Sequence, residues 1–373
     1  MLKRSILNYL KNQLGWRTSR KIVVFSIDDY GNVRVDSKAA RTEMDKGGLK
    51  IGNRFDAFDA LETRDDLELL FDILEANRAP SGSTPKFTAF SVPTNINFEE
   101  MRSANYKQPI LETLDVTFQK RAALCPAAYE GTWNVWHEGI DRRLIHPEYH
   151  GSQHFNLKVF REKLEARDPA VLCALENNSY TSITDSGYPT ISPMAACEFW
   201  DSAENEEIEE QMREGLLKFK KVFRFEATHF NPPGGRESSV IHGLLAELGV
   251  KYIDLPLLAK EPLGHDRYKY TLNYTGKRTP EGLTCLVRNV VFEPNDDRSF
   301  DWVDFTMAQV AAAFRNGKPA IISSHRVNFC GHISAKNRGK GLSALKQLLG
   351  KIKTTYPDVE FMFAQELGEL IRE

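Results

Sequence analysis

Short apolar runs alternate with amphipathic stretches along most of the chain. Residues 21–27 (KIVVFSI) are rich in β-branched residues and end at Asp28 and Asp29, which predicts a buried strand followed by a polar turn. Residues 65–77 place leucine and phenylalanine at the spacing of one helical face, and residues 85–92 predict the next strand. Strands that alternate with helices in this way predict a parallel sheet with crossover helices.

The alternation continues to the C-terminal end of the chain. Further strands are expected at about 222–229, 251–255, 283–292, 319–324 and 359–363, and further helices at about 37–46, 110–122, 156–168, 203–220, 238–248, 302–315 and 343–353. This gives about seven strands, and no break in composition marks a linker. We therefore expect an α/β fold with a single (β/α) barrel, complete or incomplete, over residues 21–373.

In two segments the apolar residues follow neither the helical nor the strand spacing. Residues 125–154 are irregular and rich in aromatic residues, and residues 168–200 contain proline, Asn-Asn, serine and glycine signals. We interpret the second segment as an insertion over one face of the domain.

The N-terminal residues carry positive charge, and their apolar positions recur at helical spacing with polar residues between them. A secretory signal would need an unbroken apolar stretch. We expect residues 1–20 to form a short helix that packs on the domain, with contact of residues 1–16 with a membrane surface as the alternative.

The composition excludes several classes of protein. The 373 residues include 49 Lys and Arg against 51 Asp and Glu, a net charge of −2, and no cluster of basic residues is interleaved with aromatics. We therefore expect no nucleic-acid partner. No stretch reaches the roughly 18–20 apolar residues of a transmembrane helix. The five cysteines are scattered and show no paired spacing, which is typical of reduced thiols and favours a cytoplasmic protein.

Three histidines form two overlapping pairs at a spacing of four residues: His146, His150 and His154. On a helix or a helical turn this spacing places imidazoles on one face, where they can point at one ion. Pro147 argues against a helix that includes His146, so His150 and His154 are the better pair. Surface or capping histidines are the alternative interpretation.

Two histidines hold a catalytic metal weakly, and a carboxylate would complete the site while leaving positions open for water and substrate. Asp28 and Asp29 are the obvious source. Adjacent residues at a strand end point in different directions, so one carboxylate can bind the ion while the other accepts a proton. Alternatively, either aspartate only begins the turn before Gly31.

Five segments together resemble the motifs of the NodB-type polysaccharide deacetylases, in the family's order. Residues 25–29 (FSIDD) resemble the T-F-D-D motif, residues 150–154 (HGSQH) the H-x-x-x-H motif, residues 230–234 (FNPPG) the R-x-P-Y segment, residues 301–302 (DW) the end of D-x-x-D-W, and residues 323–325 (SSH) the L-x-H motif. The run Asp-Asp-Tyr-Gly also resembles the YdjC-type deacetylases, which suggests a divergent branch of the same barrel superfamily.

The resemblance implies a distorted (β/α) barrel and a divalent metal, usually zinc, held by Asp29, His150 and His154. It further implies that Asp28 is the general base and His325 the general acid. The expected activity is the removal of acetyl groups from an N-acetylated sugar or polysaccharide by metal-activated water, so that the partner is an acetylated carbohydrate.

Further residues are expected to contact the substrate. The resemblance implies this role for Asn231, Pro232 and Gly234 in the turn and for Trp302 beside the acetyl methyl group. Arg326 follows His325 in a loop that we expect to reach the substrate.

The chain also departs from the family pattern. Asn231 stands where the family has the arginine that orients the base, and Arg298 stands at the first aspartate of D-x-x-D-W. Arg298, Arg236 or Arg326 are candidates to supply the missing charge. Two alternatives therefore stay open: a carbohydrate-binding barrel that has lost catalysis, and a metal-dependent hydrolase of another amide or ester. A glycosidase fits poorly, because adjacent carboxylates cannot flank one glycosidic bond.

Overall fold

A parallel sheet of nine strands, curled into an incomplete barrel, forms the centre of the molecule in a computed structural model that describes residues 8–373. Eight strands follow the order β10-β7-β6-β5-β2-β1-β12-β11, and β13 pairs with β1 beside them. The strands are β1 (Ile22–Tyr30), β2 (Phe87–Ser91), β5 (Ile145–Tyr149), β6 (His229–Phe230), β7 (Tyr252–Asp254), β10 (Thr284–Leu286), β11 (Val290–Val291), β12 (Ala320–His325) and β13 (Glu360–Met362). The expected α/β barrel fold is confirmed, with more strands than the seven predicted.

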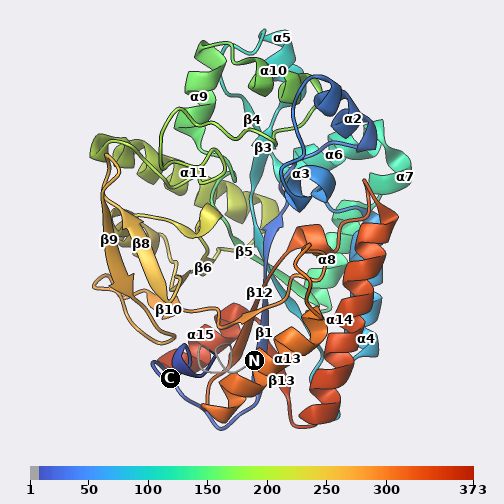
Figure 1. Ribbon diagram of the computed structural model, residues 1–373, viewed down its shortest axis with the longest axis vertical. Coiled ribbons are helices and arrows are strands. Elements are labelled where there is room, and N and C mark those ends of the chain that lie inside the picture. Colours follow the sequence, from blue (N-terminus) through green and yellow to red (C-terminus); the bar gives the residue numbers. More distant parts are fainter. Residues whose placement is uncertain (1–7) are drawn as a thin grey trace.

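Helices cover the outer face of this sheet (Figure 1). They are α2 (Lys38–Lys46), α3 (Arg54–Phe58), α4 (Arg64–Ala76), α5 (Phe98–Ser103), α6 (Leu114–Leu124), α7 (Pro126–Tyr129), α8 (Thr132–Asp141), α9 (Leu157–Glu165), α10 (Pro169–Glu176), α11 (Asn205–Phe223), α12 (His242–Glu247), α13 (Trp302–Arg315), α14 (Ala335–Thr355) and α15 (Ala364–Arg372). Short 3₁₀ turns lie at Ser202–Glu204 (η1), Pro233–Gly235 (η2), Ser239–Ile241 (η3) and Arg326–Asn328 (η4). Figure 1 shows α4 and α14 side by side along one edge of the molecule.

The central strand β1 explains why the sheet forms where it does. All nine of its residues are buried, because helices cover one face and the interior of the curled sheet covers the other. Phe25 packs against Phe87 of β2 and Phe361 of β13, so one side chain links three strands. A strand buried on both faces reads as a continuous apolar run, which is the pattern of residues 21–27.

The ring of strands does not close by hydrogen bonds. Strands β10 and β11 are its two free edges, although only residues 287–289 separate them in the chain. The segment 283–292, predicted as one strand, is therefore two short strands on opposite sides of the gap. The chain turns across the opening instead of continuing along one edge.

Two antiparallel hairpins lie outside the main sheet. One pairs β3 (Thr94–Ile96) with β4 (Leu111–Thr113), and the other pairs β8 (Leu258–Pro262) with β9 (Tyr268–Leu272). Figure 1 shows the second hairpin at the outer edge of the molecule, away from α4 and α14.

Other predicted elements need correction. The segment 125–154 is not irregular, because it holds α7, α8 and β5. His146 lies on β5, outside any helix, as Pro147 indicates. The predicted strand at 222–229 is reduced to β6, since α11 continues to Phe223. The segment 168–200 begins with α10 and then has no helix or strand. Of the predicted N-terminal helix, residues 8–10 are helical and residues 1–7 lie outside the described part of the chain.

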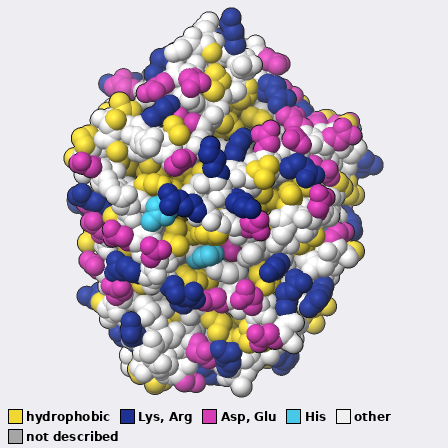
Figure 2. Space-filling view, turned by 180° about the vertical axis from the view of Figure 1, so that it is seen from behind, with side chains coloured by type: hydrophobic (Ala, Val, Ile, Leu, Met, Phe, Trp, Pro, Cys, Tyr) yellow, Lys and Arg dark blue, Asp and Glu magenta, His cyan; other side chains and the backbone are white. Residues whose placement is uncertain are grey.

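The surface reflects the near-zero net charge. On the face seen in Figure 2, basic and acidic side chains are intermixed. Within residues 8–373, no helix has the length and apolar character needed to cross a bilayer.

Candidate metal and catalytic site

A cavity of about 650 Å³ opens at the carboxyl ends of the strands, and the predicted site residues meet there. Asp28 and Asp29 come from the end of β1, His150 and His154 from the loop after β5, and His325 from the end of β12. In the parallel register Asp28 lies directly opposite His325. The chemistry thus sits where (β/α) barrels place it.

A bulge in β1 turns both aspartates into the cavity. The register between β1 and β2 shifts between Ile27 and Tyr30, and Asp29 has a φ of +76°, which is uncommon for a residue other than glycine. In a regular strand, neighbouring side chains would point to opposite faces. The bulge instead lets Asp28 and Asp29 line the same cavity.

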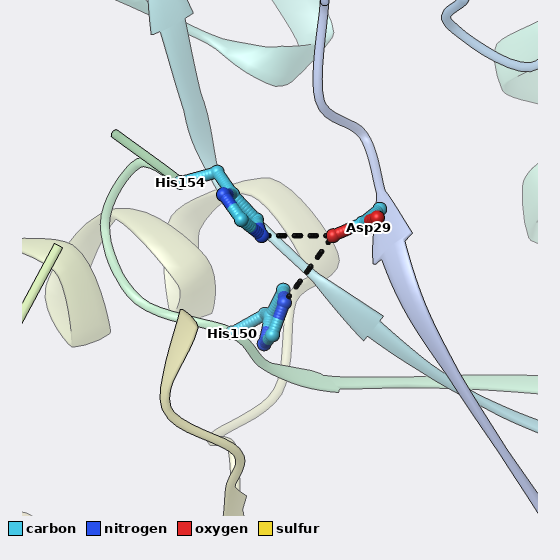
Figure 3. Close-up of side chains that lie close together, drawn as sticks. All are labelled: Asp29, His150 and His154. Carbon is cyan, nitrogen blue, oxygen red and sulfur yellow. Dashed lines mark ion pairs between the residues drawn. The ribbon is translucent and has the colours of Figure 1, made fainter. Parts of the chain in front are cut away.

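Asp29, His150 and His154 converge on one point (Figure 3). One potential ligand atom from each residue lies within 4.8 Å of the others, and all three residues are buried. The Nε2 atoms of His150 and His154 lie 3.5 and 2.9 Å from Oδ1 of Asp29. The two histidines lie in a loop and not on a helix, and this loop brings both imidazoles to Asp29.

The charge states of this group suit a divalent ion. Burial lowers the pKa of His154 to about 4, so its imidazole is neutral at pH 7. Burial alone would raise the pKa of Asp29, but Arg34 and the two imidazoles outweigh it and hold that pKa well below its usual value. Ligand groups must be deprotonated to bind a metal, and Asp29 and His154 meet that condition.

Buried polar atoms that lack a hydrogen-bond partner also fit a metal site. Oδ2 of Asp29 and Nε2 of His150 are buried and lack a hydrogen-bond partner among the described residues. Nδ1 of His150 lies 2.7 Å from the backbone oxygen of Asn231, so the Nδ1–H tautomer donates there and leaves Nε2 free to ligate. Two histidines and one carboxylate with open positions are a donor set of catalytic metal sites.

Asp28 is held by a residue that the sequence motifs did not indicate. Arg288 donates from both terminal nitrogens to the two carboxylate oxygens of Asp28, at 2.7 and 2.8 Å, and from Nε to Asp254 at 2.6 Å. Asn231 adds a hydrogen bond from Nδ2 to Oδ1 of Asp28 at 2.9 Å. The bidentate pair fixes the plane of the Asp28 carboxylate.

This geometry corrects the expected source of the orienting charge. Arg298 pairs with Asp296 on the surface, Arg236 pairs with Glu198, and Arg326 pairs with buried Asp59 and Glu62. None of the three donates to Asp28. Arg288, in the segment between β10 and β11, supplies the charge that orients Asp28.

His325 is paired with Glu293, which lies two residues after the end of β11. Nδ1 of His325 lies 2.6 Å from the Glu293 carboxylate, and its Nε2 lies 3.9 Å from Oδ2 of Asp28. Burial lowers the pKa of His325, but the charge and hydrogen bond of Glu293 outweigh burial and raise the pKa to about 9. The imidazole is therefore protonated at pH 7 and can donate a proton into the cavity.

The remaining predicted contacts divide into two groups. Asn231, Pro232 and Gly234 line the cavity as expected. Trp302 does not line it, since its ring packs against Phe300 and Phe305. Arg326 does not line it either, because its side chain is 1% exposed and holds Asp59 and Glu62 beneath the site.

Residues missed by the sequence analysis had weak signals. Glu293 follows a predicted strand, and the rule that barrel chemistry lies after strands could have indicated it. Arg288 lay inside the segment predicted as one strand, so no motif marked it. Arg34 lies 3.6 Å from Asp29 and 3.0 Å from Asp59, and only the folded chain brings these groups together.

The fold resembles solved structures of polysaccharide deacetylases and of other hydrolases. A probable polysaccharide deacetylase from Pseudomonas aeruginosa PAO1 is similar with a TM-score of 0.47 and 10% identity, over 94% of this chain and 91% of that one. A family 4 acetyl xylan esterase from Clostridium thermocellum, in complex with a cobalt ion, gives 0.37 and 12%, over 94% and 91%. An allantoinase gives 0.46 and 12%, over 95% and 91%. No protein-family model and no curated protein matches the sequence. At 10–12% identity, these likenesses concern the fold alone.

Proposed function

We propose that the protein is a metal-dependent hydrolase that removes acetyl groups from an N-acetylated sugar or polysaccharide. The observation that carries the proposal is the meeting of Asp29, His150 and His154 beside Asp28 and His325 in one cavity. This combination provides a metal-ligand set, a carboxylate and a protonated imidazole within reach of one substrate group.

The side chains divide the chemistry between them. A divalent ion held by Asp29, His150 and His154 would polarise the acetyl carbonyl and lower the pKa of water. Asp28 accepts a proton as water attacks the carbonyl carbon, with Arg288 and Asn231 holding its carboxylate in place. His325 donates a proton to the departing nitrogen, so that acetate and a free amine result.

The interactions of Asp28 argue for an enzyme over a barrel that only binds carbohydrate. The family's arginine is absent at position 231, yet Arg288 between β10 and β11 and Asp254 on β7 provide an arginine–aspartate pair from elsewhere in the fold. Simple carbohydrate binding would not require an arginine, only 12% exposed, that orients a cavity carboxylate. The retained geometry supports turnover.

The test measures metal content and acetate release together on the purified chain. The substrates are N-acetylated and O-acetylated sugars, offered before chelation, after chelation, and after metal is added back. We expect stoichiometric metal, and acetate release that chelation abolishes and metal restores. Release only from O-acetyl sugars would assign the activity to esters instead.

Single substitutions distinguish loss of the metal site from general loss of the folded structure. Asp29→Ala and His150→Ala should lose both metal and activity. His146→Ala is the matched control, because His146 lies on β5 just before the loop that carries His150, stacks on Phe225 and does not line the cavity. Unchanged metal content and hydrolysis in Asp29→Ala and His150→Ala would refute the assignment.

A further inference from the structure

The β8–β9 hairpin exposes an apolar face. The register pairs Leu258 with Leu272 and Lys260 with Tyr270, so these side chains share one face of the ribbon. Leu258, Tyr270 and Leu272 are 60%, 63% and 51% exposed. The other face, which includes Ala259 and Thr271, lines a separate cavity of about 180 Å³. The face that carries Leu258, Tyr270 and Leu272 is therefore the one left exposed. We call it the outer face.

A second exposed apolar group adjoins the base of this hairpin. Tyr9, Leu10 and Leu14 are each about half exposed. The backbone of Trp16 donates to the oxygen of Thr275 at 2.8 Å, which ties this segment to the chain just after β9. Most of the large exposed apolar side chains in the described residues lie in these two segments. We call residues 8–16 and 258–276 together the apolar platform.

The platform lies among positive charges although the whole chain is slightly acidic. Residues 258–278 contain five Lys and Arg against two acidic residues, and residues 8–20 contain three Lys and Arg with no acidic residue. Tyrosines on the hairpin alternate with lysines, and Nζ of Lys260 lies 3.7 Å from the ring centroid of Tyr268. Tyrosine and leucine beside cationic side chains are typical of surfaces that sit at a lipid–water boundary.

We propose that the apolar platform docks the protein on the surface of an anionic phospholipid membrane. Leucine and tyrosine side chains would enter the headgroup region while the basic residues attract acidic lipids. A second copy of the chain fits less well, because a symmetric pair would bring two surfaces of the same positive charge together.

The platform adjoins the site proposed above for hydrolysis. Leu255 and Pro256 line the large cavity, and β8 begins two residues later at Leu258. Docking would therefore bring one wall of the cavity close to the membrane, where a lipid-linked or membrane-bound glycan is presented. Vesicle binding needs no substrate, so its failure is distinguishable from failure of the proposed hydrolysis.

The test is co-sedimentation of the full chain with vesicles of phosphatidylcholine alone and of phosphatidylcholine with phosphatidylglycerol. We expect binding to the acidic vesicles that weakens as salt rises, because exposed charges are screened. The variant Leu258→Ser/Tyr270→Ser/Leu272→Ser should bind at least about tenfold more weakly, given the transfer free energy of each side chain. Lys260→Glu/Arg278→Glu should also weaken binding.

Matched controls carry changes of the same kind elsewhere. Leu124→Ser/Leu217→Ser removes two leucines of similar exposure on α6 and α11, and Lys340→Glu/Lys346→Glu reverses two exposed charges on α14. Both should bind like the parent. Equal binding by the platform variants and the parent would overturn the proposal. So would no binding to acidic vesicles, or a dimer in solution that the serine variant converts to a monomer.

Discussion

Glu293 controls the proton on His325 and therefore the pH range of the proposed reaction. Burial lowers the pKa of His325, but the charge and hydrogen bond of Glu293 raise it to about 9. A general acid acts only while it is protonated, so we expect kcat/KM to fall as pH rises through about 9. Glu293→Gln removes the charge that stabilises the imidazolium and should move this fall to lower pH. The measurement is the pH profile of kcat/KM.

A second carboxylate provides the control for this pH profile. Glu261→Gln removes a carboxylate that is bound to Ser239 outside the large cavity, and it should leave the profile unchanged. If Glu293→Gln keeps the alkaline limb of the parent, His325 is not the group that titrates there.

Single residues differ in how well the sequence predicts them. The sequence predicts Asp28, Asp29 and His325 as site candidates because each follows a predicted strand, and it predicts His150 and His154 because of their spacing. Trp302 was placed wrongly because an aromatic residue after an aspartate does not reveal which face of α13 it occupies. Arg288 was missed because its importance depends on Asp28 and Asp254, which lie 260 and 34 residues away in the chain.

Helix α14 packs against the turn that follows His325, and Gly341 makes this close contact. A Cβ at position 341 would lie 1.7 Å from the backbone oxygen of Asn328, so Gly341→Ala must displace the η4 turn. We expect a loss of about 1–3 kcal/mol in the free energy of unfolding. Turnover should fall as well, because η4 begins directly after His325. Denaturant unfolding and kcat measure the two effects.

The same helix supplies the control. A Cβ at Gly339 would meet no atom within 4 Å, so Gly339→Ala should stabilise the protein by about 0.5–1 kcal/mol through helix propensity alone. If both substitutions change stability in the same direction, the close contact at Gly341 does not limit the packing of α14.

Helices whose apolar residues recur at a regular helical spacing were predicted well. Helix α13 has the predicted bounds, because its apolar positions recur regularly and Asp301 caps its first turn. Strand β5 was missed because His146, Pro147 and Glu148 interrupt its apolar run, and only its buried position in the sheet reveals it. The β8–β9 hairpin was missed because Pro262 at the end of β8 and Gly264 in the turn suggest a loop.

The closure of the whole barrel could not be predicted from the sequence. The order of strands places the edges β10 and β11 at a gap, and this order depends on contacts between residues far apart in the chain. Pattern analysis counts strands but does not show which two remain unpaired. In this molecule, a side chain from the gap joins two strands that lie on either side of it in the sheet.

Arg288 is that side chain, and it links the end of β1 to the end of β7 through Asp28 and Asp254. Arg288→Met leaves two carboxylates without their counter-charge, so we expect a loss of about 3–5 kcal/mol in the free energy of unfolding. We also expect turnover to fall about 10- to 100-fold, because the Asp28 carboxylate loses its fixed orientation. Denaturant unfolding and kcat are the measurements.

A double variant separates closure of the barrel from orientation of the base. Asp254→Asn added to Arg288→Met removes one of the two unpaired charges, so part of the lost stability should return. Turnover should stay low, because Asp28 still lacks its bidentate partner. Arg288→Lys keeps the charge but cannot bind both oxygens of Asp28 in one plane, so it should recover more stability than turnover. If turnover instead recovers in proportion to stability across these variants, Arg288 acts only by holding the barrel together.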